Sequence, residues 1–196
     1  MAATEPQRTP DDTGRARVSV RALVLLGVVA IGILTVDQLA KYLIVSNLEV
    51  GEIVPVLGQI LQFHFVKNSG AAFSLASGFT WILSIVALGV IAAIVVFAKR
   101  IKSAAWAWML GLLLGGALGN VTDRLFREPS FGQGHVIDFI QVWGFPAIFN
   151  IADIAICTAM GLFLLLTLRG VRLDGTKASE TIERIPKPDA PGASEE

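Results

Sequence analysis

Residues 104–125, AAWAWMLGLLLGGALGNVTDRL, decide the class of fold. The stretch is mostly apolar over about 20 residues, the length that a helix needs to cross the hydrocarbon core of a bilayer. Three further stretches meet the same requirement: 22–45, 80–98 and 146–168. The chain is 54% hydrophobic with a mean hydropathy of +0.65, too apolar for a soluble domain of this size. We therefore expect an all-α membrane protein with four transmembrane helices.

Positive charge predicts the orientation of these spans. Lys and Arg gather before the first span, between the second and third, and after the fourth. The opposite side carries only Lys67, Arg124 and Arg127. By the positive-inside rule, both termini lie in the cytoplasm and segments 46–79 and 126–145 lie outside.

The parts of the chain beyond the spans differ in character. Residues 61–65, LQFHF, alternate apolar and polar side chains as a half-buried strand does, so a small extracytoplasmic β-sheet is expected near 49–67. Residues 1–21 are too polar for a cleaved signal peptide, and residues 171–196 are charged and contain Pro. Both tails are predicted to be disordered and cytoplasmic, which leaves 22–170 as the membrane domain.

Three aspartates lie within the predicted spans: Asp37, Asp123 and Asp153. A carboxylate at the centre of a span costs about 2.5–3.5 kcal/mol, so each one calls for a reason. With a rise of about 1.5 Å per residue, all three approach the outer face. Lys41 follows Asp37 at i+4, the spacing of an intrahelical ion pair, so Asp37 either anchors the first helix or takes a direct part in a site.

Asp123 and Asp153 share a local pattern. Each follows an Asn by three residues, in Asn120-x-x-Asp123 and Asn150-x-x-Asp153, so two helices each present an amide and an acid on one face. Two carboxylates that meet at close range share a proton, as in aspartic proteases, where one activates water and the other donates to the scissile carbonyl. The alternative is that each acid caps a helix or reaches to the interface, and two acids at one depth favour the catalytic interpretation.

Other residues are weaker signals. Gly111, Gly115 and Gly119 repeat at i+4 and favour close packing of the third span, or a slot for a substrate helix. His64 and His135 lack metal-ligand spacing, so no metal is expected. Asp138 lies in the second outer segment, where ordering of the loop is favoured over catalysis. Cys157, within an apolar run, is interpreted as a packing residue.

Several stretches resemble, in order, the motifs of bacterial lipoprotein signal peptidases, also called prolipoprotein signal peptidases or signal peptidase II. The matching stretches are 37–41 (DQLAK), 68–73 (NSGAAF), 115–124 (GGALGNVTDR), 136–140 (VIDFI) and 149–153 (FNIAD). The resemblance implies that Asp123 and Asp153 are the catalytic pair of an aspartic endopeptidase. Residues expected to bind substrate or support the site are Asp37, Lys41, Asn68, Gly70, Asn120, Arg124, Asp138 and Asn150.

The resemblance also implies the substrate and the location. The substrate would be a prolipoprotein carrying diacylglycerol on a cysteine, cut just before that cysteine at the outer face of the bacterial cytoplasmic (inner) membrane. We expect membrane lipid as a partner, a monomer, no cofactor and no nucleic acid. The segment 68–73, with the outer strand, is a candidate cover for a substrate that enters from the lipid, and Gly70 would allow a tight turn there.

Two other classes of function compete with a protease. A proton carrier also uses intramembrane acids, but its path needs polar groups through the full thickness of the membrane. The inner halves of these spans are almost wholly apolar. A scaffold for a partner membrane protein would use the acids as interface contacts, and only a cleavage assay separates it from a protease.

Overall fold

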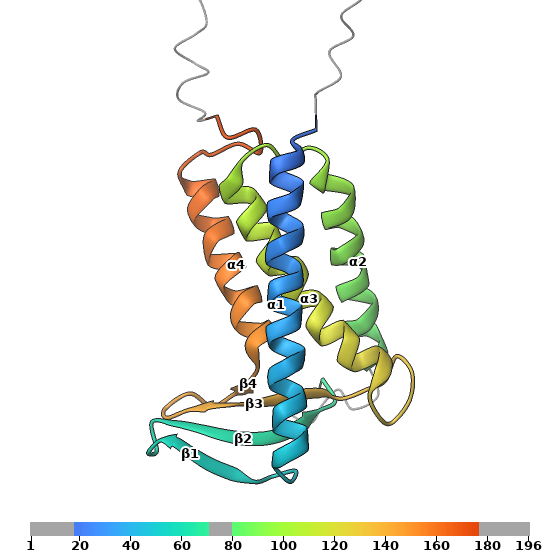
Figure 1. Ribbon diagram of the computed structural model, residues 1–196, viewed down its shortest axis with the longest axis vertical. Coiled ribbons are helices and arrows are strands. Elements are labelled where there is room, and N and C mark those ends of the chain that lie inside the picture. Colours follow the sequence, from blue (N-terminus) through green and yellow to red (C-terminus); the bar gives the residue numbers. More distant parts are fainter. Residues whose placement is uncertain (1–17, 71–79, 177–196) are drawn as a thin grey trace, which may run out of the picture.

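The computed structural model describes residues 18–70 and 80–176. In this part of the chain four helices lie side by side, and a four-stranded sheet lies across one end of them (Figure 1). The helices are α1 (Val20–Asn47), α2 (Thr80–Ala98), α3 (Ala104–Phe126) and α4 (Ile151–Leu168). The strands are β1 (Ile53–Leu57), β2 (Leu61–Asn68), β3 (Val136–Val142) and β4 (Ile148–Phe149).

The helices have the surface of a membrane protein. Each of the four is long and apolar enough to cross a bilayer. Their outward faces expose large apolar side chains, among them Val28, Ile31, Val96 and Leu164. Such a surface is favourable when it contacts lipid and would be a large exposed apolar patch in water. The prediction of four transmembrane helices is confirmed.

α3 is the most buried of the four helices, and its glycines explain how the neighbours approach it. A Cβ atom on Gly115 would lie 2.6 Å from the carbonyl oxygen of Ala30 in α1. A Cβ atom on Gly116 would lie 2.6 Å from the carbonyl oxygen of Ala152 in α4. The predicted role of small residues in close packing of the third span is therefore confirmed.

The sheet is antiparallel, with strand order β1-β2-β3-β4. Strands β1 and β2 fall where the sequence predicted a sheet, whereas β3 and β4 come from the second outer segment and were not predicted. Ile44 of α1 packs with Phe65, Ile137 and Phe139 of the sheet in a buried apolar cluster. This cluster fixes the sheet against the end of α1, and with it the position of every side chain on β3.

Two boundaries differ from the predictions. α4 begins at Ile151 and not at 146, because residues 148–149 form β4 and Asn150 caps the helix. Residues 171–176, predicted as the start of a disordered tail, hydrogen-bond to the loop before α3, where the carbonyl oxygen of Leu173 accepts from Lys102 N at 2.9 Å. The remaining tail residues and Ala71–Phe73 of the NSGAAF motif lie outside the described residues.

Candidate active site

A buried ionic cluster joins α1 to α3. Lys41 Nζ lies 2.8 Å from Asp37 Oδ2 and 2.8 Å from Asp123 Oδ2, and all three side chains are fully buried. Arg127 Nε lies 2.6 Å from Asp123 Oδ1. Asp37 Oδ1 also accepts a hydrogen bond from the backbone N–H of Ala152 at 2.9 Å, which ties the cluster to α4. Two cations thus balance two carboxylates at the point where three helices meet.

Asp123 is fully engaged by this cluster. Besides its two ion pairs, its carboxylate accepts hydrogen bonds from the backbone N–H of Ile137 at 3.2 Å and from Gln38 Nε2 at 3.3 Å. A carboxylate has about four lone-pair sites, so little capacity remains for a water or a substrate. The contacts of Asp123 thus tie α3 to α1 and β3.

The expected meeting of the Asp123 and Asp153 carboxylates is corrected by the structure. Lys41 and Asn120 connect the two acids: Lys41 Nζ contacts Asp123 and donates to Asn120 Oδ1 at 3.1 Å, and Asn120 Nδ2 donates to Asp153 Oδ1 at 2.8 Å. The i/i+3 spacing put Asn120 and Asp123 on one face of α3, as expected, but Asp123 contacts α1 through Lys41 while Asn120 contacts Asp153.

Asp153 lies in the first turn of α4. Asn150 is the N-cap, with its Oδ1 accepting from Asp153 N at 3.0 Å, and Asp153 Oδ2 accepts from Asn150 N at 3.2 Å, which completes a capping box. The sequence pattern Asn150-x-x-Asp153 therefore marks a helix start, and the capping box leaves the question of catalysis by Asp153 open. The N-terminal end of a helix also favours negative charge on a side chain.

Asp138 is brought to the same place by β3. Its Oδ1 accepts from Asn150 Nδ2 at 2.6 Å and its Oδ2 from Asn68 Nδ2 at 2.7 Å. Burial raises the pKa of the Asp138 carboxyl to about 6, and the charge of Asp153 also raises this pKa. The hydrogen bonds from Asn68 and Asn150 lower it. A carboxyl with this pKa can hold a proton close to neutral pH.

Two cavities meet at Asp138. One, of about 550 Å³, lies along the start of α4 and is lined by Asp138 and Asp153 together with apolar side chains such as Phe149 and Ile154. The other, of about 750 Å³, lies toward α2 and α3 and is lined by Asp138, Gly70, Leu83 and Arg124. Asn68, Ala147 and Ile148 line both cavities. The pair Asp138 and Asp153 therefore faces open space, in contrast to Asp123.

Arg124 lines the second cavity. Its Nη1 contacts the carbonyl oxygen of Asn120 at 3.5 Å, a long hydrogen bond. Its Nε is buried and has no hydrogen-bond partner within the part of the chain that the structure describes. A buried N–H group without an acceptor is costly.

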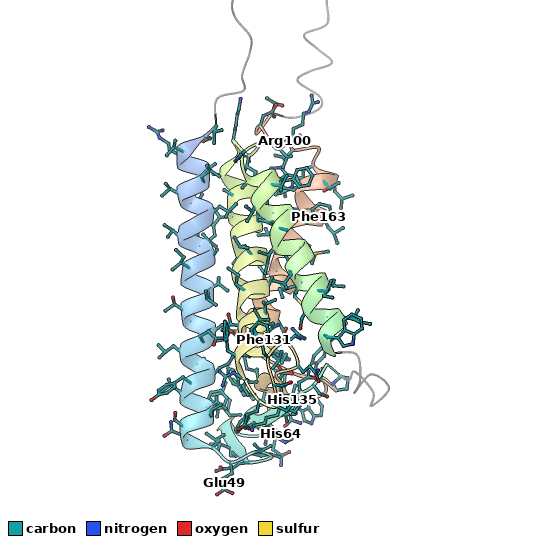
Figure 2. All side chains as sticks on the ribbon, turned by 90° about the vertical axis from the view of Figure 1, so that its right-hand side faces the viewer. Glu49, His64, Arg100, Phe131, His135 and Phe163 are labelled. Carbon is teal, nitrogen blue, oxygen red and sulfur yellow. The ribbon has the colours of Figure 1, made fainter. Side chains whose placement is uncertain are left out.

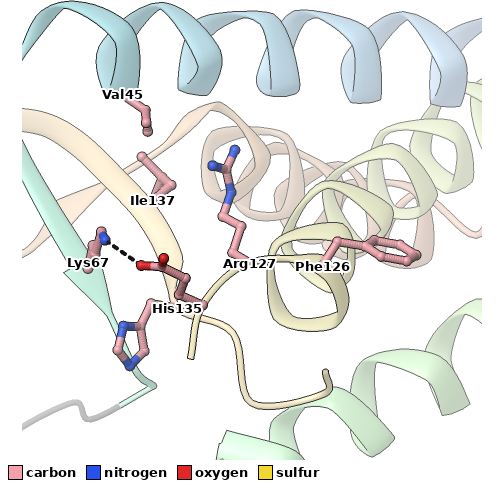
Figure 3. A pocket seen from close by; sticks show the side chains of 7 residues that line it. Val45, Lys67, Phe126, Arg127, His135 and Ile137 are labelled. Atoms are coloured by element: carbon pink, nitrogen blue, oxygen red, sulfur yellow. Dashed lines mark hydrogen bonds and ion pairs between the residues drawn. The ribbon is translucent and has the colours of Figure 1, made fainter. Parts of the chain in front are cut away.

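A separate cavity of about 320 Å³ lies between the end of α1, β2 and the segment after α3 (Figure 3). Lys67 pairs there with Glu128 at 3.3 Å, and His135 and Arg127 line the same space. Neither Asp138 nor Asp153 belongs to its lining. His64 lies elsewhere, on β2, with its Nδ1 3.0 Å from Gln141 Oε1.

The sequence thus named most of the residues at the site but missed some. Arg127 was not singled out, although its i+4 spacing to Asp123 is the signal of an ion pair. Cys157, interpreted as a packing residue, is exposed on α4 and lines the cavity that holds Asp153. Ala147 and Ile148 gave no signal, because they contribute mainly backbone and apolar surface.

Comparisons with known proteins agree with these features. Residues 29–169 match the family model described as signal peptidase (SPase) II. The chain is 57% identical over 183 residues to the lipoprotein signal peptidase of Leifsonia xyli subsp. xyli, covering 89% of this chain and 85% of that protein. It is 44% identical over 176 residues to the lipoprotein signal peptidase of Rhodococcus jostii, covering 88% of each.

A solved structure is also similar. It is described as a bacterial membrane enzyme determined by the in meso method at 2.3 Å resolution. The TM-score is 0.67 with 26% sequence identity, over 87% of this chain and 96% of that chain.

Proposed function

The chain belongs to the signal peptidase II family and is a membrane protease, and from that premise we propose that Asp138 and Asp153 are the catalytic pair of an aspartic endopeptidase. One observation carries this choice: both carboxyls line the same cavity of about 550 Å³. Asp123, the acid expected from the sequence motif, is instead neutralised by Lys41 and Arg127. We therefore assign Asp123 a structural role.

The environments of the two acids support different roles. Asp153 accepts from Asn120 Nδ2 and Asn150 N at the start of a helix, where negative charge is favoured, so it is the general base. Asp138, with its pKa raised by burial, holds the proton that the pair shares and is the general acid.

Hydrolysis then proceeds in two steps. A water loses a proton to Asp153 as its oxygen bonds to the carbonyl carbon, and Asp138 gives its proton to the carbonyl oxygen. The C–N bond then breaks as Asp153 passes its proton to the leaving nitrogen, and a hydroxyl proton of the intermediate returns to Asp138. Arg124 lines the adjoining cavity, where its guanidinium would donate to a substrate oxygen.

The substrate proposal rests on the relatives, which are named lipoprotein signal peptidases. We propose that the chain removes the signal peptide from diacylglyceryl-modified prolipoproteins by cutting before the lipidated cysteine. The mainly apolar lining of the cavity along α4 suits a segment that enters sideways from lipid. One chain supplies both carboxyls, so a monomer suffices.

The membrane orientation that we propose from the distribution of Lys and Arg agrees with the way the two ends of the molecule differ. Arg100, after α2, lies at the end opposite to Glu49 and His64 (Figure 2). The described chain begins and ends at the end of the bundle opposite to the sheet (Figure 1). Asp138 lies on β3 of that sheet, and Asp153 lies in the first turn of α4, directly after β4. With the positive end in the cytoplasm, the active site faces outward and both tails are cytoplasmic.

The function is tested on purified protein in detergent with a synthetic peptide that carries a signal sequence and a diacylglyceryl cysteine. Asp138→Asn and Asp153→Asn should each abolish cleavage while the thermal unfolding midpoint changes little. Asp123→Asn is the matched variant, and it should lower the midpoint yet leave cleavage in the folded fraction. Cleavage by folded Asp138→Asn at the wild-type rate would remove this residue from the mechanism.

A further inference from the structure

β4 is an edge strand with one open side. It is two residues long and pairs with β3 only at Ile140↔Phe149 and Gln141↔Ile148. In the sheet order β1-β2-β3-β4 it has no neighbour on its other side within the described chain. An open strand edge presents backbone N–H and C=O groups on which another chain can form hydrogen bonds.

The open edge of β4 lies near the two acids, Asp138 and Asp153, because residues of the strand and both acids line the same cavity. Ala147 and Ile148 line both of the cavities that meet at Asp138, one toward α4 and one toward α2. Ala147 is exposed and directly precedes β4. Immediately after β4 the chain reaches Asn150, whose side chain donates to the Asp138 carboxyl and accepts from the backbone N–H of Asp153. Backbone on the edge and carboxyls in the cavities thus face the same space.

We propose that the segment of the substrate that is cut binds as an added, extended β-strand on the open edge of β4, held by backbone hydrogen bonds to residues 147–149. This inference rests on the proposed function, because it describes how the substrate peptide binds near the proposed catalytic pair. An added strand gains affinity from its backbone, while pockets on alternate sides receive its side chains. A strand on this edge runs beside residues 147–149, with the two cavities that Ala147 and Ile148 line available for its side chains.

The proposal explains a physical requirement of the reaction. A transmembrane signal segment in helical form keeps its backbone groups bonded to one another, which hides the scissile carbonyl. A segment that unwinds near the membrane surface must find new partners for those groups. The edge of β4 supplies such partners next to the acids. Recognition through backbone also tolerates many side-chain sequences.

The experiment replaces single amide bonds of the synthetic diacylglyceryl peptide by esters, one position at a time on both sides of the scissile bond. An ester lacks the N–H donor and has a weaker acceptor. In an added strand, successive residues point their backbone groups alternately toward and away from the partner. We expect kcat/KM to fall about tenfold at every second position and to change little between them.

A flat profile, or losses that repeat every three or four positions as in a helix, would overturn the strand proposal. The all-amide peptide is the control for the function itself. If wild-type protein cuts it and Asp138→Asn does not, the proposed function stands whatever the ester profile shows. If wild-type protein does not cut it, the proposed function and the strand proposal both fail.

Discussion

The Lys41 ammonium lies 2.8 Å from Asp123 Oδ2, and neither side chain is exposed. The same nitrogen contacts Asp37 Oδ2 and donates to Asn120 Oδ1, so one cation links α1 to α3 and reaches the residue that holds Asp153. Removal of one partner from a buried ionic cluster leaves an uncompensated charge, which costs more than the pair contributes.

Lys41→Met should therefore lower the free energy of unfolding by about 3–5 kcal/mol. Lys67→Met is the matched control, because Lys67 pairs with Glu128 at the surface and such pairs contribute about 0–1 kcal/mol. Chemical denaturation in detergent, followed by circular dichroism, measures both. Equal, small effects of the two substitutions would contradict the role assigned to the buried cluster.

Asn120 is predicted to position Asp153. Its Oδ1 accepts from Lys41 Nζ and Asn150 Nδ2, which orients its Nδ2 toward Asp153 Oδ1. A hydrogen bond to a charged group contributes about 1.5–3 kcal/mol, so Asn120→Ala should lower kcat roughly 10- to 100-fold with little change in KM.

Thr122→Ala serves as its control, because the Thr122 hydroxyl donates only within α3, to the carbonyl oxygen of Leu118. It should leave kcat and KM near the wild-type values. A rise in KM with unchanged kcat in Asn120→Ala would indicate that Asn120 binds substrate and does not orient the base.

The raised pKa of Asp138 predicts a pH dependence. The proposed acid must be protonated, so kcat/KM should fall as pH rises through about 6, where burial places the pKa of this carboxyl. Asn68→Ala removes a hydrogen bond that stabilises the carboxylate. The pKa of Asp138 should then rise further, and the alkaline limb of the pH profile should move to higher pH.

The same substitution at an exposed asparagine, Asn47→Ala, should leave that limb in place, since Asn47 donates to Leu43 O at the surface. The measurement is the initial rate of peptide cleavage at low substrate concentration across the pH range. A shift of the limb to lower pH in Asn68→Ala would show that Asp138 is not the group that must hold the proton.

The spans and the first half of the sheet were predictable, because they depend on local patterns. Length and hydropathy identified four helices, and alternation in residues 61–65 identified β2. β3 was not predicted, since residues 136–139 are all buried and therefore do not alternate between apolar and polar. A buried strand with an acid in it looks like an irregular apolar run.

The choice between Asp123 and Asp138 could not be made from local patterns. Helical spacing shows which side chains share a face of a helix, but it does not show which neighbouring element that face contacts. Asp123 pairs with Lys41, which lies on α1 and far away in the sequence, and this contact is the basis for the structural role that we propose for Asp123. The family resemblance named Asp138 as a site residue, but it lies on an unpredicted strand, so no local pattern placed it beside Asp153.

The close contact between α3 and α4 gives the last prediction. A Cβ atom on Gly116 would lie 2.6 Å from the carbonyl oxygen of Ala152 and 2.8 Å from Ile156 Cγ1. Backbone at that distance cannot move without displacing the first turn of α4, which contains Asp153. Gly116→Ala should destabilise the protein by about 1–3 kcal/mol, as overpacking does, and should also reduce kcat.

Gly161→Ala, in the same bundle, has no atom within 4 Å of the added Cβ and should be neutral or slightly stabilising, because Ala favours helix over Gly. Thermal unfolding midpoints and cleavage rates of the two variants, measured in one detergent, make the comparison. If Gly116→Ala loses stability but keeps full kcat, the start of α4 adjusts independently of α3, and Asp153 does not depend on this contact for its position.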